Sequence, residues 1–188
     1  MGRSVAGEMA ARTVSVNVKA LNAERLGRAQ ARMREADLPA ALLFDPANTR
    51  YVACDGQFLV ANLHCSYRWA LVFADDDPIL WDGADQMHVS RSRWDGDIRK
   101  ASGFTFFGSG PNSRRDARTA IAEVVAEVRA RGLEREPLGV DRAETVAFLE
   151  LAAQGIAVVD AVPILEDCAR GEDTPRAPNP PRERAVGR

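Results

Sequence analysis

The stretch PLGVDRAETVAFLELAAQGIAVVDA, residues 137–161, decides the fold class of this chain. PLGVD at 137–141 and IAVVDA at 156–161 are short apolar runs of the kind that form strands. Between them, residues 143–154 predict a helix that ends at Gly155. A strand, a helix and a strand in this order place two parallel strands side by side. The stretch therefore predicts an α/β domain.

Further apolar runs upstream predict a mixed sheet. RWALVF at 68–73 and PILWD at 78–82 are separated by a short segment that contains Asp75 to Asp77, which predicts a β-hairpin with an acidic turn. AALLF at 40–44 has the length and composition of a buried strand, and FTFF at 104–107 predicts another. Antiparallel and parallel strands are thus expected in one sheet.

Helices and turns are expected between these strands. We expect one amphipathic helix over residues 22–37, with Asn22 as its capping residue, and a turn at DPANTRYV, residues 45–52. A second helix opens at Ser113 in SRRDARTAIAEVVAEVRARG, with Gly132 as its stop. Residues 83–103 give mixed signals and no clear element.

Composition and charge exclude several classes of function. The chain has 25 basic and 27 acidic residues, so it lacks the excess of positive charge that binding to many phosphates requires. Nucleic acid is therefore not an expected partner. Its longest apolar runs are far shorter than the roughly 20 residues that span a bilayer, so no membrane partner is expected. The first twenty residues do not fit a secretory signal, and we expect a cytoplasmic protein. They carry four charged residues: Arg3, Glu8, Arg12 and Lys19.

The chain divides into three parts. Residues 1–20 are expected to be a poorly ordered leader, and residues 21–167 a single domain. Residues 168–188 predict a disordered tail, because the last 14 residues hold four of the ten prolines and four arginines. Such a segment buries too little apolar surface to offset the entropy lost on ordering it.

The titratable residues form no recognisable metal or catalytic motif. His64 and His88 stand 24 positions apart without a ligand-type neighbour at helical spacing, whereas a metal site needs three or four converging ligands. Scattered aspartates and glycines are interpreted as surface groups and turn residues: Asp82, Asp85, Asp95, Asp97, and Gly108 to Gly110. The three cysteines, Cys54, Cys65 and Cys168, lack a CxxC pairing and are interpreted as buried thiols, of which Cys54 and Cys65 are expected to be inert.

RLGRAQARMREADLPAALLFDPANTRYV, residues 25–52, resembles the opening of the N-terminal domains of creatinase, aminopeptidase P and prolidase. YRWALVF, PILWD, LGVD and VVDAVPILEDCAR follow in the order that this resemblance implies, over roughly residues 22–170. The middle segment NTRYVACDGQFLVANLHCSYRWALVF, residues 48–73, is also similar to dimethylsulfoniopropionate lyases of the same fold.

The resemblance implies a three-layer domain, with helices flanking a mixed sheet, in a two-domain parent protein. In that parent a second, pita-bread domain holds two divalent metal ions through Asp, Asp, His, Glu and Glu ligands, which supply a bridging hydroxide. None of these ligands can be placed here, so no cofactor is expected in this chain itself. The Arg- and Pro-rich end favours the hypothesis of a natural truncation or a shifted reading frame past residue 168.

The polar stretch 54–67 has the best claim to a functional role. The resemblance implies dimers in which the N-terminal domain of one subunit closes the active site of the other around small substrates. His64, Tyr67 and Arg68 are the candidate substrate-binding residues, and the planar fork of Arg68 suits a carboxylate. The alternative is that Arg68 simply flanks a strand.

Three functions remain open from the sequence. The leading hypothesis is an isolated, non-catalytic N-terminal domain of a metal-dependent Xaa-Pro peptidase or creatinase-like protein, with a role in dimerisation or substrate gating. The first alternative is a fragment of an active metallohydrolase or lyase whose pita-bread domain lies outside this chain. The second is a module that binds a small molecule, a peptide or a partner. The expected partners are accordingly a second copy of the chain and a small-molecule or peptide ligand.

Overall fold

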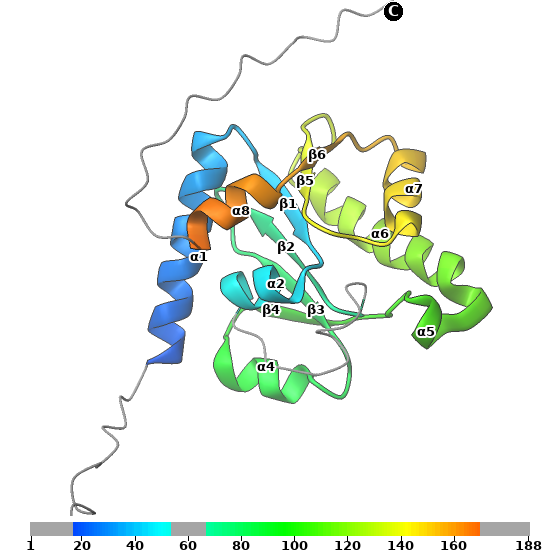
Figure 1. The fold of residues 1–188 in the computed structure, drawn as a ribbon, viewed down its shortest axis with the longest axis horizontal. Helices are drawn as coiled ribbons and strands as arrows, with labels where there is room; N and C mark the ends of the chain where they lie inside the picture. The colour runs from blue at the N-terminus through cyan, green and yellow to red at the C-terminus, as the bar shows by residue number, and fades with distance from the viewer. Residues whose placement is uncertain (1–16, 54–66, 170–188) are drawn as a thin grey trace, which may run out of the picture.

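The computed structural model describes residues 17–53 and 67–169. One sheet of six strands lies at its centre, in the order β4-β3-β2-β1-β5-β6 (Figure 1). β2 pairs antiparallel with β1 and β3, and the β1–β5, β5–β6 and β3–β4 pairs are parallel, which confirms the mixed sheet and the predicted hairpin. The strands are β1 (Ala40–Leu43), β2 (Trp69–Phe73), β3 (Ile79–Asp82), β4 (Asp97–Lys100), β5 (Leu138–Val140) and β6 (Val158–Asp160).

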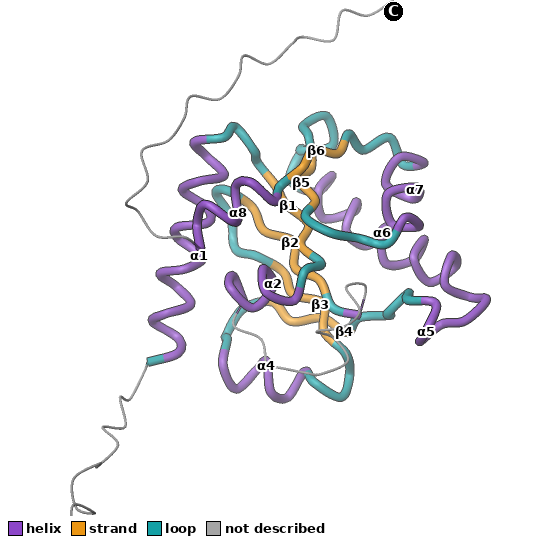
Figure 2. Tube along the Cα trace, viewed as in Figure 1, coloured by secondary structure: helices purple, strands orange, loops and turns teal. Residues whose placement is uncertain are grey.

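Helices cover both faces of the sheet (Figure 2). One face packs against α1 (Val18–Glu35), α2 (Pro46–Ala53) and α8 (Val162–Ala169), and the other against α6 (Ser113–Ala130) and α7 (Thr145–Ala153). The predicted three-layer α/β architecture is confirmed. Shorter helices, α4 (Met87–Arg93), α5 (Phe106–Ser109) and the 3-10 helix η2 (Gly110–Asn112), connect the strands at the sheet's margins. None of the helices in the described ranges is both long and apolar enough to cross a membrane.

The central strand β1 shows why the core has two halves. Successive side chains of a strand point to opposite faces, so Leu42 packs beneath α6 and α7 while Leu43 packs beneath α1 and α2. Every residue of β1 is buried, as the continuous apolar run at 40–44 predicts for a strand covered on both sides.

The first helix begins earlier than the sequence pattern predicts. α1 starts at Val18, and Asn17 is its cap, because the Asn17 side chain accepts a hydrogen bond from the Ala20 amide at 3.1 Å. The expected cap, Asn22, instead lies in the second turn and is only 3% exposed. Two asparagines five positions apart offer the same capping chemistry, and the tertiary structure selects the first.

Two local predictions are wrong, and one strand was not predicted. Residues 45–52 form a helix rather than a turn, because Pro46 stands at the first helical position, where its missing N–H costs nothing. FTFF contains no strand, since Phe106 begins the short helix α5 and is exposed to solvent. The edge strand β4 was not predicted, because its sequence DIRK lacks the apolar residues that mark a buried strand.

Several predictions lie outside the described residues: most of the leader, the tail beyond residue 169, and the side chains of Cys54, His64 and Cys65. The described structure continues past the predicted domain boundary at residue 167, because α8 extends to Ala169. Cys168 is buried in that helix, as expected, and burial raises the pKa of its thiol.

Candidate functional site

Arg68 lies at the start of β2 and forms a buried ion pair with the last residue of β3. Its Nε donates to Asp82 Oδ1 at 2.8 Å, and Nη2 lies 2.7 Å from the same oxygen. The exposed fractions of the two residues are 6% and 1%. The interpretation of Asp82 as a surface group is therefore wrong. It fails because β2 and β3 are neighbouring antiparallel strands, which bring the first residue of the hairpin beside its last.

Asp82 also holds the segment that follows it. Its Oδ1 accepts the amide N–H of Gly83 at 2.8 Å, and its Oδ2 accepts the Ser90 hydroxyl at 2.6 Å from α4. Ser90 is fully buried. A carboxylate with donors at both oxygens has its hydrogen-bonding capacity well satisfied inside a protein. Arg68 is thus fixed in position by the fold.

Tyr67 lies beside this pair, at the open end of the β2–β3 hairpin. A Cβ built on Gly83 would be 3.5 Å from the Tyr67 ring, and one built on Gly108 would be 3.8 Å from it. The Tyr67 ring therefore lies between the end of β3 and the short helix α5. Phe106 and Phe107 of α5 are 72% and 74% exposed, so aromatic surface faces solvent at this edge.

These positions bring together two of the three candidate residues. Tyr67 and Arg68 occupy one edge of the sheet next to α5, and His64 lies outside the described residues. The role of all three in substrate binding stays a prediction. His88 lies exposed on α4, and Asp75 to Asp77 form the exposed hairpin turn that the sequence predicts.

A second buried carboxylate, Asp141, organises the C-terminal end of β1, beside the start of β2, and was missed as a structural residue. Its Oδ1 accepts the Phe44 amide at 2.8 Å, and its Oδ2 accepts the Asp45 amide at 3.0 Å and the Asn48 side-chain amide at 2.9 Å. The Arg142 amide is a fourth donor, at 2.5 Å from Oδ1. Burial raises the pKa of the Asp141 carboxyl, and these four N–H groups oppose that rise. Asp141 thereby ties β5 to the start of α2.

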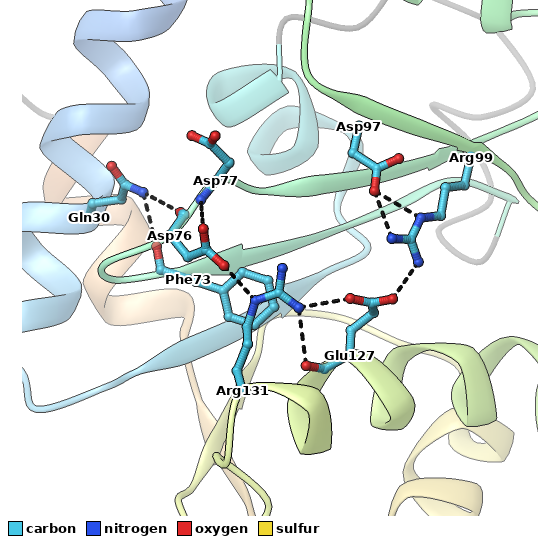
Figure 3. Close-up of polar contacts among 8 residues, drawn as sticks. All are labelled: Gln30, Phe73, Asp76, Asp77, Asp97, Arg99, Glu127 and Arg131. Carbon is cyan, nitrogen blue, oxygen red and sulfur yellow. Dashed lines mark hydrogen bonds and ion pairs between the residues drawn. The ribbon is translucent and has the colours of Figure 1, made fainter.

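A chain of charged side chains joins α6 to the hairpin and to the edge strand (Figure 3). Glu127 of α6 lies between Arg99 and Arg131, with an N–O distance of 2.7 Å to each. Arg131 also donates to Asp76 at 2.7 Å, and its guanidinium lies 4.0 Å from the centre of the Phe73 ring. These contacts lower the pKa of Glu127, chiefly through the hydrogen bond from Arg99.

From the other layer, Gln30 of α1 donates to the backbone carbonyls of Phe73 and Asp76 at 3.0 and 2.9 Å (Figure 3). Both helical layers therefore hold the same hairpin turn. Because each charged side chain in this network has an oppositely charged partner, the arrangement is typical of a structural role rather than of a catalytic site. Within residues 17–53 and 67–169, no three His, Cys, Asp or Glu side chains converge as metal ligands would.

The fold is a three-layer α/β domain. Helices cover both faces of its mixed sheet, and buried polar groups hold the ends of its strands. The model of the creatinase/prolidase N-terminal domain matches residues 25–168, more than half of the chain. The chain belongs to this family. The comparison with curated proteins found no match.

Solved structures share the fold at low sequence identity. An Xaa-Pro aminopeptidase structure from Streptococcus pyogenes is 17% identical, with a TM-score of 0.56 over 79% of this chain and 98% of that one. The N-terminal domain of the cytoplasmic peptidase PepQ from Mycobacterium tuberculosis H37Rv is 18% identical, with a TM-score of 0.56 over 77% of this chain and 98% of that one.

A third structure, an Xaa-Pro dipeptidase from Bacillus anthracis, is 15% identical and has a TM-score of 0.55. The match covers 78% of this chain but only 35% of the dipeptidase chain. The shared fold is therefore about a third of that protein.

Proposed function

We propose that this chain serves as the non-catalytic N-terminal domain of an Xaa-Pro peptidase-like or creatinase-like metallohydrolase, with a role in dimerisation or in closing a substrate site. The two divalent metal ions of such a hydrolase would be bound by a separate catalytic domain. The Bacillus anthracis dipeptidase supports this division, because the shared fold makes up only about a third of its chain.

The observation that carries the proposal is the edge formed by Tyr67, the Arg68–Asp82 pair and α5. The buried ion pair fixes the entry of β2, so Tyr67, which directly precedes Arg68, is presented from a rigid base. Next to it, the exposed side chain of Phe106 offers apolar surface to a second protein surface. Rigid support beside exposed aromatic surface suits a domain that docks against another and covers its site.

Tyr67 supplies the polar function at this edge. A tyrosine side chain combines an apolar ring with a hydroxyl that donates or accepts a hydrogen bond, which suits contact with a small polar substrate. Arg68 acts in this proposal mainly as a positioning residue, because most of its guanidinium surface is already covered.

The proposal is tested by assaying the purified full chain with manganese, cobalt or iron and a panel of Xaa-Pro dipeptides. We expect no turnover above the blank, and light scattering at rising protein concentration should show self-association. Metal-dependent turnover that elutes with the homogeneous chain would overturn the non-catalytic role. A strict monomer at high concentration would overturn dimerisation through this domain alone.

A further inference from the structure

A cavity between α1 and the α4–β4 connection contains a buried amide without a partner. Its volume is about 290 Å³. Asn22 of α1 lines it and is 3% exposed, yet neither its Nδ2 nor its Oδ1 has a hydrogen-bond partner among the described residues. Leaving a donor and an acceptor buried and unpaired is costly, so the site is built for a group that supplies both.

The size of the cavity argues against a single ordered water as the whole explanation. One water takes up about 30 Å³ in the liquid, so the cavity has room for a molecule with the dimensions of an amino acid. Asn22 lies on the same side of α1 as Lys19 and Leu26, which also line the cavity. The unpaired amide is therefore part of a formed pocket.

The walls of the cavity carry charges of both signs. Arg93 and Asp77 line it, and neither makes an ion pair with another residue in the part of the chain that the structure describes. Lys19 and Asp95, by contrast, are bound to each other at 2.6 Å. The cavity thus offers one cation and one anion to a ligand.

Trp94 shapes one wall, and Gly96 makes room for it. A Cβ built on Gly96 would lie 2.0 Å from Cζ2 of the Trp94 ring, so the ring packs directly onto the glycine backbone. Any side chain at position 96 would displace the indole. The position of this wall therefore depends on the glycine.

We propose that this cavity binds a small zwitterion that bears a primary carboxamide. The carboxamide pairs with Asn22 through two reciprocal hydrogen bonds, since each amide has an N–H donor and a carbonyl acceptor. The carboxylate of the ligand faces Arg93, and its ammonium group faces Asp77. This binding site is separate from the edge that carries Tyr67 and Arg68.

L-Glutamine is the probe and L-glutamate its matched control, because the two differ only in the terminal amide. In the full chain, L-glutamine should shift the NMR signals of the Asn22 amide and the Trp94 indole N–H saturably. Glutamate, which lacks the amide donor, should bind roughly tenfold more weakly. Absence of a saturable shift with glutamine, or equal shifts with both amino acids, would overturn the proposal.

Asn22→Leu separates a ligand-binding amide from a structural one. It should abolish the glutamine shifts and raise the thermal midpoint of the unliganded chain, because it removes an unpaired buried polar group. A lowered midpoint in both Asn22→Leu and Asn22→Ala would show that the amide has a structural partner, and would overturn the assignment. Arg93→Ala should weaken glutamine binding, whereas Arg91→Ala, on the same helix outside the cavity, should not.

Discussion

Arg68 and Asp82, fourteen positions apart, form a buried ion pair in which the Arg68 Nε donates to Asp82 Oδ1 at 2.8 Å. The pair joins the first residue before β2 to the last residue of β3, so it closes the open end of the hairpin. The acidic turn closes the other end. A hairpin fixed at both ends presents the neighbouring edge, with Tyr67, as a rigid surface.

Breaking this pair should be strongly destabilising. Arg68→Met leaves the Asp82 charge buried without its cation, and we expect a loss of about 3–5 kcal/mol in the free energy of unfolding. The double variant Arg68→Met with Asp82→Leu should recover part of that loss, because no charge is left uncompensated. Urea unfolding measures all three proteins. Equal stability of the single variant and the wild type would contradict a structural role for the pair.

Asp141→Asn tests the second buried carboxylate. The amide that replaces one oxygen is a donor and cannot accept from the backbone N–H groups that surround Asp141. At least one buried N–H is left unpaired, which should cost about 1–3 kcal/mol of stability at neutral pH. Thermal and urea unfolding provide the measurement. Asp167→Asn is the matched control, because Asp167 is exposed and the same change there should be nearly neutral.

The stability of the domain should fall with acid in part through Glu127. Arg99 and Arg131 hold the pKa of Glu127 below its ordinary value of 4.5. A depressed pKa means that the contribution is present above 4.5 and is lost as the pH falls through the folded-state pKa. Because the group is partly solvated, the contribution should be about 1 kcal/mol or less.

Glu127→Gln isolates this contribution. The variant should be less stable than the wild type at neutral pH, and the difference should shrink as the pH falls below 4.5 and through the depressed pKa of Glu127. Urea unfolding across pH 3 to 7 tests the prediction. A difference that stays constant with pH would show that the glutamine disturbs packing rather than charge.

Phe106→Asp tests whether the aromatic surface of α5 is a docking face. Because Phe106 is 72% exposed, the substitution should leave the thermal midpoint nearly unchanged. Self-association measured by light scattering should decrease, since a charge would be placed in the contact. Leu149→Asp is the control, because Leu149 is 57% exposed on a different helix, α7. Equal effects of the two changes would show a general effect of added charge.

Local patterns were sufficient where burial is continuous. The runs at 40–44, 68–73 and 78–82 lie near the middle of the sheet, so their apolar composition alone marks them as strands. Gly132 has a φ of 70°, which explains why it ends α6 as predicted. The polar edge strand β4 carries no such pattern, and the apolar run at 104–107 is misleading because Phe106 and Phe107 face solvent.

Candidate residues were harder to interpret than elements. The sequence places Tyr67 and Arg68 next to each other before a strand, but not beside Asp82 or Gly83. Asparagine is a residue type that often caps helices, so the sequence pattern predicts Asn22 as a cap. In the structure Asn22 instead lines a cavity. A polar residue type does not reveal burial, because burial depends on which other segments pack over it.

The sequence by itself determined the α/β class, the hairpin, the parallel strands around α7 and the family resemblance, since these follow from the spacing of apolar residues along the chain. Only the tertiary structure decided which polar residues are buried in pairs and which, like Asn22, remain unpaired. The physical reason is that a hydrogen bond or an ion pair forms between groups that are close in space, and the fold brings them together from distant positions.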